Sequence, residues 1–114
     1  MSGMFMQSVT ILRAPLVIDK YGNPSSVRDW ARATTTVVNG VSVQPSAGTE
    51  IDADRQTVIS GWRLFTRTGV DIDLLPTDRV VSDGVTAEVD GEVARFRLSG
   101  RVHHVEAQLK RVTG

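Results

Sequence analysis

The chain has 114 residues, 13 basic and 13 acidic side chains, and no cysteine. This length predicts a single domain over residues 1–114. The missing cysteines exclude a disulfide scaffold, a cysteine zinc site and thiol catalysis, and the zero net charge argues against a free-standing nucleic-acid-binding protein. No apolar run has membrane-spanning length, and residues 1–7 lack the features of a signal peptide. We therefore expect no membrane association and a flexible N-terminus at residues 1–7.

Valine, isoleucine and threonine make up 33 of the 114 residues. Their β-branched side chains fit a pleated sheet better than a helix. Short apolar runs also alternate with turn-forming sequences along the chain. We therefore expect an all-β fold, a small barrel or sandwich of about seven or eight short antiparallel strands with a long loop and at most one helical turn.

The N-terminal part of the chain predicts a bent strand, a turn and a short helical turn. Residues 9–18 predict a strand that bends at Pro15, which has no N–H to donate to a ladder. The sequence of residues 21–24 is typical of a turn. Residues 25–33 have room for one helical turn with Ser26 as its cap.

Three dipeptides suit two-residue hairpin turns, because both of their residues tolerate positive φ. They are Asn39-Gly40, Asp83-Gly84 and Asp90-Gly91. We expect the chain to reverse at Asp90-Gly91. In the strand that follows, side chains should then alternate between the two faces of the hairpin. The face that we expect to be apolar and inward carries Ala94, Phe96 and Leu98, and the exposed face carries Arg95 and Arg97.

Two longer strands complete the predicted fold. Residues 57–67 are apolar at both parities, as expected of a strand that is covered on both faces or that crosses a barrel corner at Gly61. Residues 102–112 alternate regularly and predict a full-length strand, one face of which carries His103 and the apolar Val105, Ala107 and Leu109. Its adjacent His103 and His104 are expected to point to opposite faces, so the two could not hold one metal ion together.

The two loops between these strands differ in composition. Residues 45–56 lack apolar alternation and predict a long loop, which is either functional or disordered, and both interpretations stay open. Residues 67–77 contain Asp71 and Asp73 between apolar side chains, which we expect to be displayed to a partner. Neither acidic pair, Asp52 with Asp54 or Asp71 with Asp73, continues as a calcium-binding loop. Without a nucleophile motif or a phosphate-binding loop, we expect no enzyme activity, no metal and no cofactor.

The charges are unevenly distributed along the neutral chain. The net charge is +2 over residues 1–47, −6 over residues 48–92 and +4 over residues 93–114. An acidic middle and a basic end favour pairing between copies of the chain or with a stacked partner.

A series of short blocks in a fixed order covers nearly the whole chain. The blocks are Leu12-Arg13-Ala14-Pro15, Asp19, Tyr21-Gly22-Asn23, Asp29-Trp30, Val43-Gln44-Pro45, Glu50, Gly61-Trp62-Arg63-Leu64-Phe65, Gly69-Val70-Asp71, Thr77-Asp78-Arg79-Val80, Val89-Asp90-Gly91-Glu92, Gly100-Arg101, His104-Val105-Glu106 and Leu109-Lys110-Arg111-Val112. In this order the chain resembles the head-to-tail stopper (head-closure) proteins of tailed bacteriophages, especially those of actinobacterial hosts. It departs from their pattern in the turn after Phe65, at Val93 and at Phe96.

The resemblance implies a small β-barrel protomer of a homo-oligomeric ring of six or twelve copies in the virion neck. Such a ring lies between the portal or its adaptor and the tail terminator. It helps to retain packaged DNA and docks the tail. The resemblance also implies that the particle is assembled in the host cytoplasm. Double-stranded DNA would pass through the lumen without sequence-specific binding. The residues expected to contact a partner or face the lumen are Glu50, Asp52, Asp54, Arg55, Asp71, Asp73, Arg95, Arg97 and Arg101. The alternative function is a small β-barrel adaptor that binds nucleic acid.

Overall fold

The computed structural model describes residues 7–46 and 61–112. Residues 1–6 of the expected flexible N-terminus and most of the expected 45–56 loop lie outside the described residues. So do four expected contact residues, Glu50, Asp52, Asp54 and Arg55. Gln7 begins a strand and pairs with Val41, so the prediction of flexibility is wrong for this residue. Pro45 itself ends a strand and pairs with Trp62, so this part of the predicted loop is wrong.

The described part of the chain is all-β, as predicted, with nine strands and one short 3-10 helix. The elements are β1 (Gln7–Arg13), β2 (Leu16–Ile18), β3 (Pro24–Arg28), the 3-10 turn η1 (Trp30–Arg32), β4 (Thr34–Pro45), β5 (Gly61–Thr66), β6 (Arg79–Ser82), β7 (Val85–Val89), β8 (Ala94–Leu98) and β9 (Arg101–Arg111).

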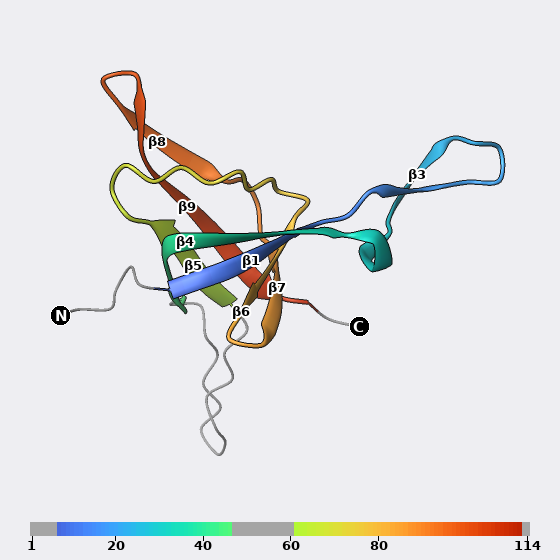
Figure 1. Ribbon diagram of the computed structural model, residues 1–114, viewed down its shortest axis with the longest axis horizontal. Helices are drawn as coiled ribbons and strands as arrows, with labels where there is room; N and C mark the ends of the chain where they lie inside the picture. Colours follow the sequence, from blue (N-terminus) through green and yellow to red (C-terminus); the bar gives the residue numbers. More distant parts are fainter. Residues whose placement is uncertain (1–6, 47–60, 113–114) are drawn as a thin grey trace, which may run out of the picture.

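Six strands form a closed antiparallel barrel in the order β5-β4-β1-β6-β7-β9, which the pairing of β5 with β9 closes (Figure 1). The inward residues alternate along each strand, as on β9, where Val105, Ala107 and Leu109 are buried as predicted. Two hairpins project from this barrel. One contains β8 and the first half of β9, and the other is the separate two-stranded sheet of β2 and β3.

The predicted hairpin at Asn39-Gly40 is wrong, because β4 continues through both residues. Gln7 pairs with Val41 and Ser8 pairs with Asn39, which leaves Gly40 without a partner in the ladder. Gly40 has φ +75°, as expected from the sequence. This conformation forms a β-bulge, however, and not a chain reversal. The bulge lies where β4 leaves its pairing with β1 and begins its pairing with β5.

The hairpin at Asp83-Gly84 is confirmed, with both residues at positive φ between the paired Ser82 and Val85. The hairpin at Asp90-Gly91 is wrong, because β7 and β8 do not pair with each other. Both instead pair with β9, and the Asp90 N–H donates to Gln108 O between the two ladders. The chain reverses later, at Ser99 and Gly100, which have φ values of 54° and 78°.

The N-terminal prediction is confirmed at the bend near Pro15, which separates β1 from β2, and at the turn that contains Gly22. The helical turn is shorter and later than predicted. It covers Trp30–Arg32, follows Asp29 at the N-cap position, and leaves Ser26 inside β3.

Candidate functional site

One end of the barrel is covered by the long connection between β5 and β6, residues 67–78, which we call the cover loop (Figure 1). Its Ile72 and Leu74 are buried and belong to the hydrophobic core. The expectation that this loop displays its apolar side chains to a partner is therefore wrong for these two residues. The open end of a six-stranded barrel is itself an apolar surface, and Ile72 and Leu74 bury it.

Arg13, at the end of β1, holds the cover loop through two aspartates. Its guanidinium donates two hydrogen bonds to the Asp78 carboxylate, at 3.0 and 2.8 Å, and contacts the Asp73 carboxylate at 3.1 Å. Asp78 is almost fully buried and also accepts the Leu75 N–H at 2.9 Å. Sequence reasoning gave no role to Arg13 or Asp78, although both lie in the ordered blocks described above.

These contacts shift the pKa values of two of the partners. The hydrogen bonds from Arg13 to Asp78 and Asp73 raise the pKa of the Arg13 guanidinium above its ordinary value, which is already high. The hydrogen bond and the positive charge of Arg13 lower the pKa of the Asp73 carboxyl below its usual value. Both groups are therefore charged at neutral pH.

The lowered pKa of Asp73 predicts a pH-dependent stability. The ion pair stabilises the fold at pH values above the unfolded-state pKa of about 4, and this contribution is lost as the pH falls through the lower folded-state pKa. Asp73→Asn is therefore expected to lower the melting temperature slightly at neutral pH and not in strong acid. Thermal unfolding of both proteins across this pH range measures the difference, and a deficit that persists below the folded-state pKa would contradict the assignment.

Arg95, on β8, binds the cover loop from the other side. Its guanidinium donates to Ile72 O at 2.9 Å and to Leu74 O at 3.2 Å, and its Nε lies 3.5 Å from the Asp71 carboxylate. The prediction that Arg95 is exposed and free to meet another copy is therefore wrong. The chain does not reverse at Asp90-Gly91, so β7 and β8 pair with the same edge of β9. The odd-numbered residues of β7 point into the barrel, and Arg95 of β8 lies on the same face of the sheet.

The same change of parity exposes the even-numbered side chains of β8. Phe96 and Leu98, predicted to face inward, are 46% and 66% exposed. Arg97 and Arg101 are exposed as well and have no acidic partner in residues 7–46 and 61–112. Of the expected contact residues, the structure thus joins Asp71 with Arg95 and Asp73 with Arg13 inside one subunit, and it leaves Arg97 and Arg101 at the surface.

A second β-bulge brings the two histidines together. Phe96 pairs with His104 and Arg97 pairs with Val102, so His103 is the extra residue. The Nδ1 atoms of His103 and His104 are 2.8 Å apart, His104 Nε2 lies 2.8 Å from the Glu106 carboxylate, and the Phe96 ring stacks on His104. The prediction that the imidazoles point to opposite faces is therefore wrong, because alternation fails at a bulge.

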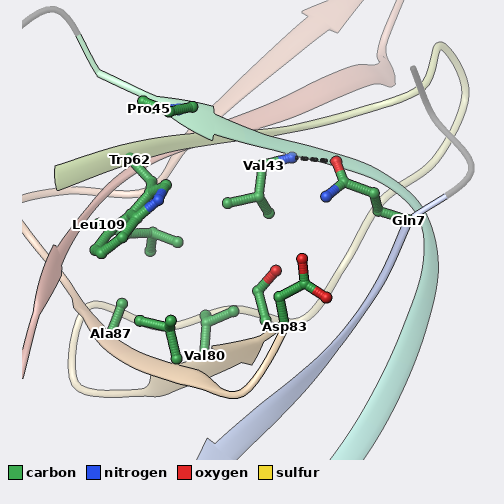
Figure 2. A pocket seen from close by; sticks show the side chains of 10 residues that line it. Gln7, Val43, Pro45, Trp62, Val80, Asp83, Ala87 and Leu109 are labelled. Atoms are coloured by element: carbon green, nitrogen blue, oxygen red, sulfur yellow. Dashed lines mark hydrogen bonds between the residues drawn. The ribbon is translucent and has the colours of Figure 1, made fainter. Parts of the chain in front are cut away.

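The end of the barrel away from the cover loop contains a cavity of about 400 Å³. Figure 2 shows Trp62 and Leu109 on one side of it and Val43 on another, where the Gln7 side chain accepts the Val43 N–H at 2.8 Å. Asp83 is the acidic residue of its lining. The lining is mostly apolar, and its polar side chains are those of Gln7, Ser82 and Asp83.

The described residues contain no group of three or more histidine, cysteine or acidic side chains placed to hold a metal ion. Among them there is also no helix long and apolar enough to cross a membrane. The expectation of no enzyme activity stays a prediction.

Comparison with solved structures gives a likeness over almost the whole chain. The protein xkdH of the phage-like element PBSX of Bacillus subtilis superposes with a TM-score of 0.50 and 15% sequence identity, over 95% of each chain. The 114-residue chain therefore shares the fold of this phage-element protein. No family model matches the sequence, and no curated protein matches it.

Proposed function

We propose that the protein is a structural component of a tailed-phage particle and acts as a ring-forming protomer of the neck. The observation that carries the proposal is the fold likeness to a phage-element protein along 95% of both chains. The ordered sequence blocks support it independently, because they resemble those of head-to-tail stopper proteins.

The arrangement of the subunit suits an assembly role. A closed barrel without free edges is a rigid support, and the two ion-paired arginines Arg13 and Arg95 fix the cover loop on one end of it. The two hairpins that project from the barrel expose apolar and basic side chains. In the proposed ring these hairpins reach neighbours, while the portal or its adaptor lies on one side and the tail terminator on the other.

The proposed ring would let DNA pass without holding it. Each phosphate that a protein neutralises adds a salt-dependent increment of affinity. The net charge of the chain is zero, and five cations of the described residues, Arg13, Arg32, Arg63, Arg95 and Lys110, are each paired with a carboxylate of the same chain. Both features weaken the attraction to DNA phosphates.

A second candidate function, a nucleic-acid-binding adaptor, gains support from one observation. Phe96 is half exposed on the same hairpin as the exposed Arg97 and Arg101, and proteins that bind single-stranded nucleic acid combine exposed aromatic rings with basic residues. A mobility-shift assay at low salt separates the candidates, since a neck protomer would give no discrete shift with single-stranded or duplex DNA.

The experiment that tests the proposed function removes the gene from the phage genome that carries it and supplies the protein from a plasmid. Without the protein, we expect finished tails and heads that package DNA but do not join and lose their DNA. The wild-type plasmid should restore joined particles. Normal particles in the absence of the protein would overturn the neck assignment.

The same assay tests the exposed basic residues. Arg97→Glu with Arg101→Glu should fail to restore joined particles, because these cations are expected to meet carboxylates of a neighbouring protein. Arg67→Glu is the matched control, since Arg67 is an exposed arginine of the cover loop. If the double variant joins heads to tails and only DNA retention changes, the two arginines contact DNA.

A further inference from the structure

The sheet of β2 and β3 with its connecting turn, residues 16–28, forms an arm that exposes large apolar side chains. Ile18 and Val27 are about 60% exposed and Tyr21 is 76% exposed. Several large apolar side chains exposed on one short hairpin are typical of a contact surface. The arm therefore has the composition of an interface and not that of a solvated hairpin.

The arm is attached to the barrel at its base alone, within the part of the chain that the structure describes. There the Arg28 guanidinium donates to Ala14 O at 3.1 Å and the Asp29 N–H donates to Pro15 O at 2.8 Å. At the far end the Asp19 carboxylate accepts the N–H groups of Tyr21 and Asn23, which fixes the turn. An isolated two-stranded sheet is marginally stable in water, so a surface that packs on the arm would stabilise it.

A complementary surface lies on the other projecting hairpin, which consists of β8 and the facing part of β9. It exposes Phe96 and Leu98, and the exposed Arg101 pairs with Leu98 across the hairpin. The arm carries Asp19, which has no ion pair within residues 7–46 and 61–112 and is therefore available to a cation of another subunit. Both hairpins thus expose apolar side chains, and Asp19, which is next to Lys20 on the arm, can pair with a cation of the other hairpin.

The two hairpins of one subunit, both within the described residues, do not contact each other. They leave the barrel on opposite sides in the view of Figure 1, where the arm lies to the right and the tip of the β8–β9 hairpin to the upper left. A contact between them must therefore join two copies. Because it joins two different surfaces, it is heterologous and can repeat around a closed ring.

We propose that the arm of one copy packs on the β8–β9 hairpin of the next copy. In this contact Ile18, Tyr21 and Val27 cover Phe96 and Leu98, and Asp19 approaches Arg101. The proposal rests on the proposed ring and identifies the partner of the arm as a second copy of the same chain. It also accounts for the exposure of apolar side chains on both hairpins.

The natural absence of cysteine allows a direct test by crosslinking. Tyr21→Cys and Leu98→Cys are introduced together, and a short bismaleimide is added to phage particles that contain the variant. We expect a ladder of covalent multimers, at least about tenfold more abundant than for the control pair Tyr21→Cys with Gln108→Cys, because neighbouring thiols have a high effective concentration. Gln108 is exposed on β9, away from the tip of the hairpin.

The possible outcomes distinguish a failure of the proposed arm contact from a failure of the proposed ring. Particles that contain a ring but yield no multimers above the control would overturn the contact and leave the neck function standing. A crosslink from position 21 to a different protein would overturn it as well, because the arm would then bind an adjacent component. Wild-type particles without a ring of this protein would overturn the proposed function and the contact together.

Discussion

Leu74→Ala is expected to lower the free energy of unfolding by about 3 kcal/mol, within the usual range for the loss of a fully buried leucine side chain. Leu74 has no exposed surface and packs in the core, although it belongs to a loop. Its removal leaves a cavity between the cover loop and the barrel. Urea unfolding followed by circular dichroism measures the change in midpoint at constant slope.

The neighbouring Leu75 provides the matched control. Leu75 is 39% exposed and stays on the outer side of the loop. Leu75→Ala should therefore cost less than about 1 kcal/mol, as is usual for surface positions. Equal losses from the two substitutions would show that the cover loop does not pack on the barrel as described.

Asp78→Ala is expected to lower the free energy of unfolding by about 2 kcal/mol. It removes the acceptor of two hydrogen bonds from Arg13 and leaves the Leu75 N–H without its partner. An unsatisfied buried donor costs about 1–3 kcal/mol. Because a third of the Arg13 side chain is exposed, water can solvate its guanidinium, which keeps the loss below that of a fully buried pair.

A double-mutant cycle separates the ion pair from general disruption of the loop. Arg13→Ala and the double variant are measured beside Asp78→Ala, and the two effects should be strongly non-additive. Asp73→Ala should have a smaller effect, because the Asp73 carboxylate is mostly exposed. Additive losses for Arg13 and Asp78 would contradict a direct coupling between them.

Several features of the fold could be predicted because they depend on local pattern. The content of β-branched residues predicts the all-β class, and the alternation of Val105, Ala107 and Leu109 predicts the inward face of β9. Pro15 and the Asp83-Gly84 pair mark a bend and a hairpin because each restricts the backbone directly. No knowledge of distant residues is needed for these predictions.

The tertiary structure decided what the other turn signals do. A residue pair that tolerates positive φ allows a reversal or a bulge, and the choice depends on which strand lies alongside. Gly40 became a bulge because β4 pairs with both β1 and β5. The chain passed Asp90-Gly91 without reversing because β9 pairs with both β7 and β8. This choice placed Arg95 against the cover loop and Phe96 at the surface.

The candidate site shows the same division. The sequence by itself determined that Asp71, Asp73 and Arg95 are charged groups in loop and strand positions, and it placed an exposed Arg97 on the last hairpin. Only the tertiary structure decided that Arg13 binds Asp78, 65 residues away in the chain, and that Arg95 binds the carbonyl groups of the cover loop. The physical reason is that such contacts depend on the closing of the barrel between β5 and β9, a pairing of distant strands that no local pattern encodes.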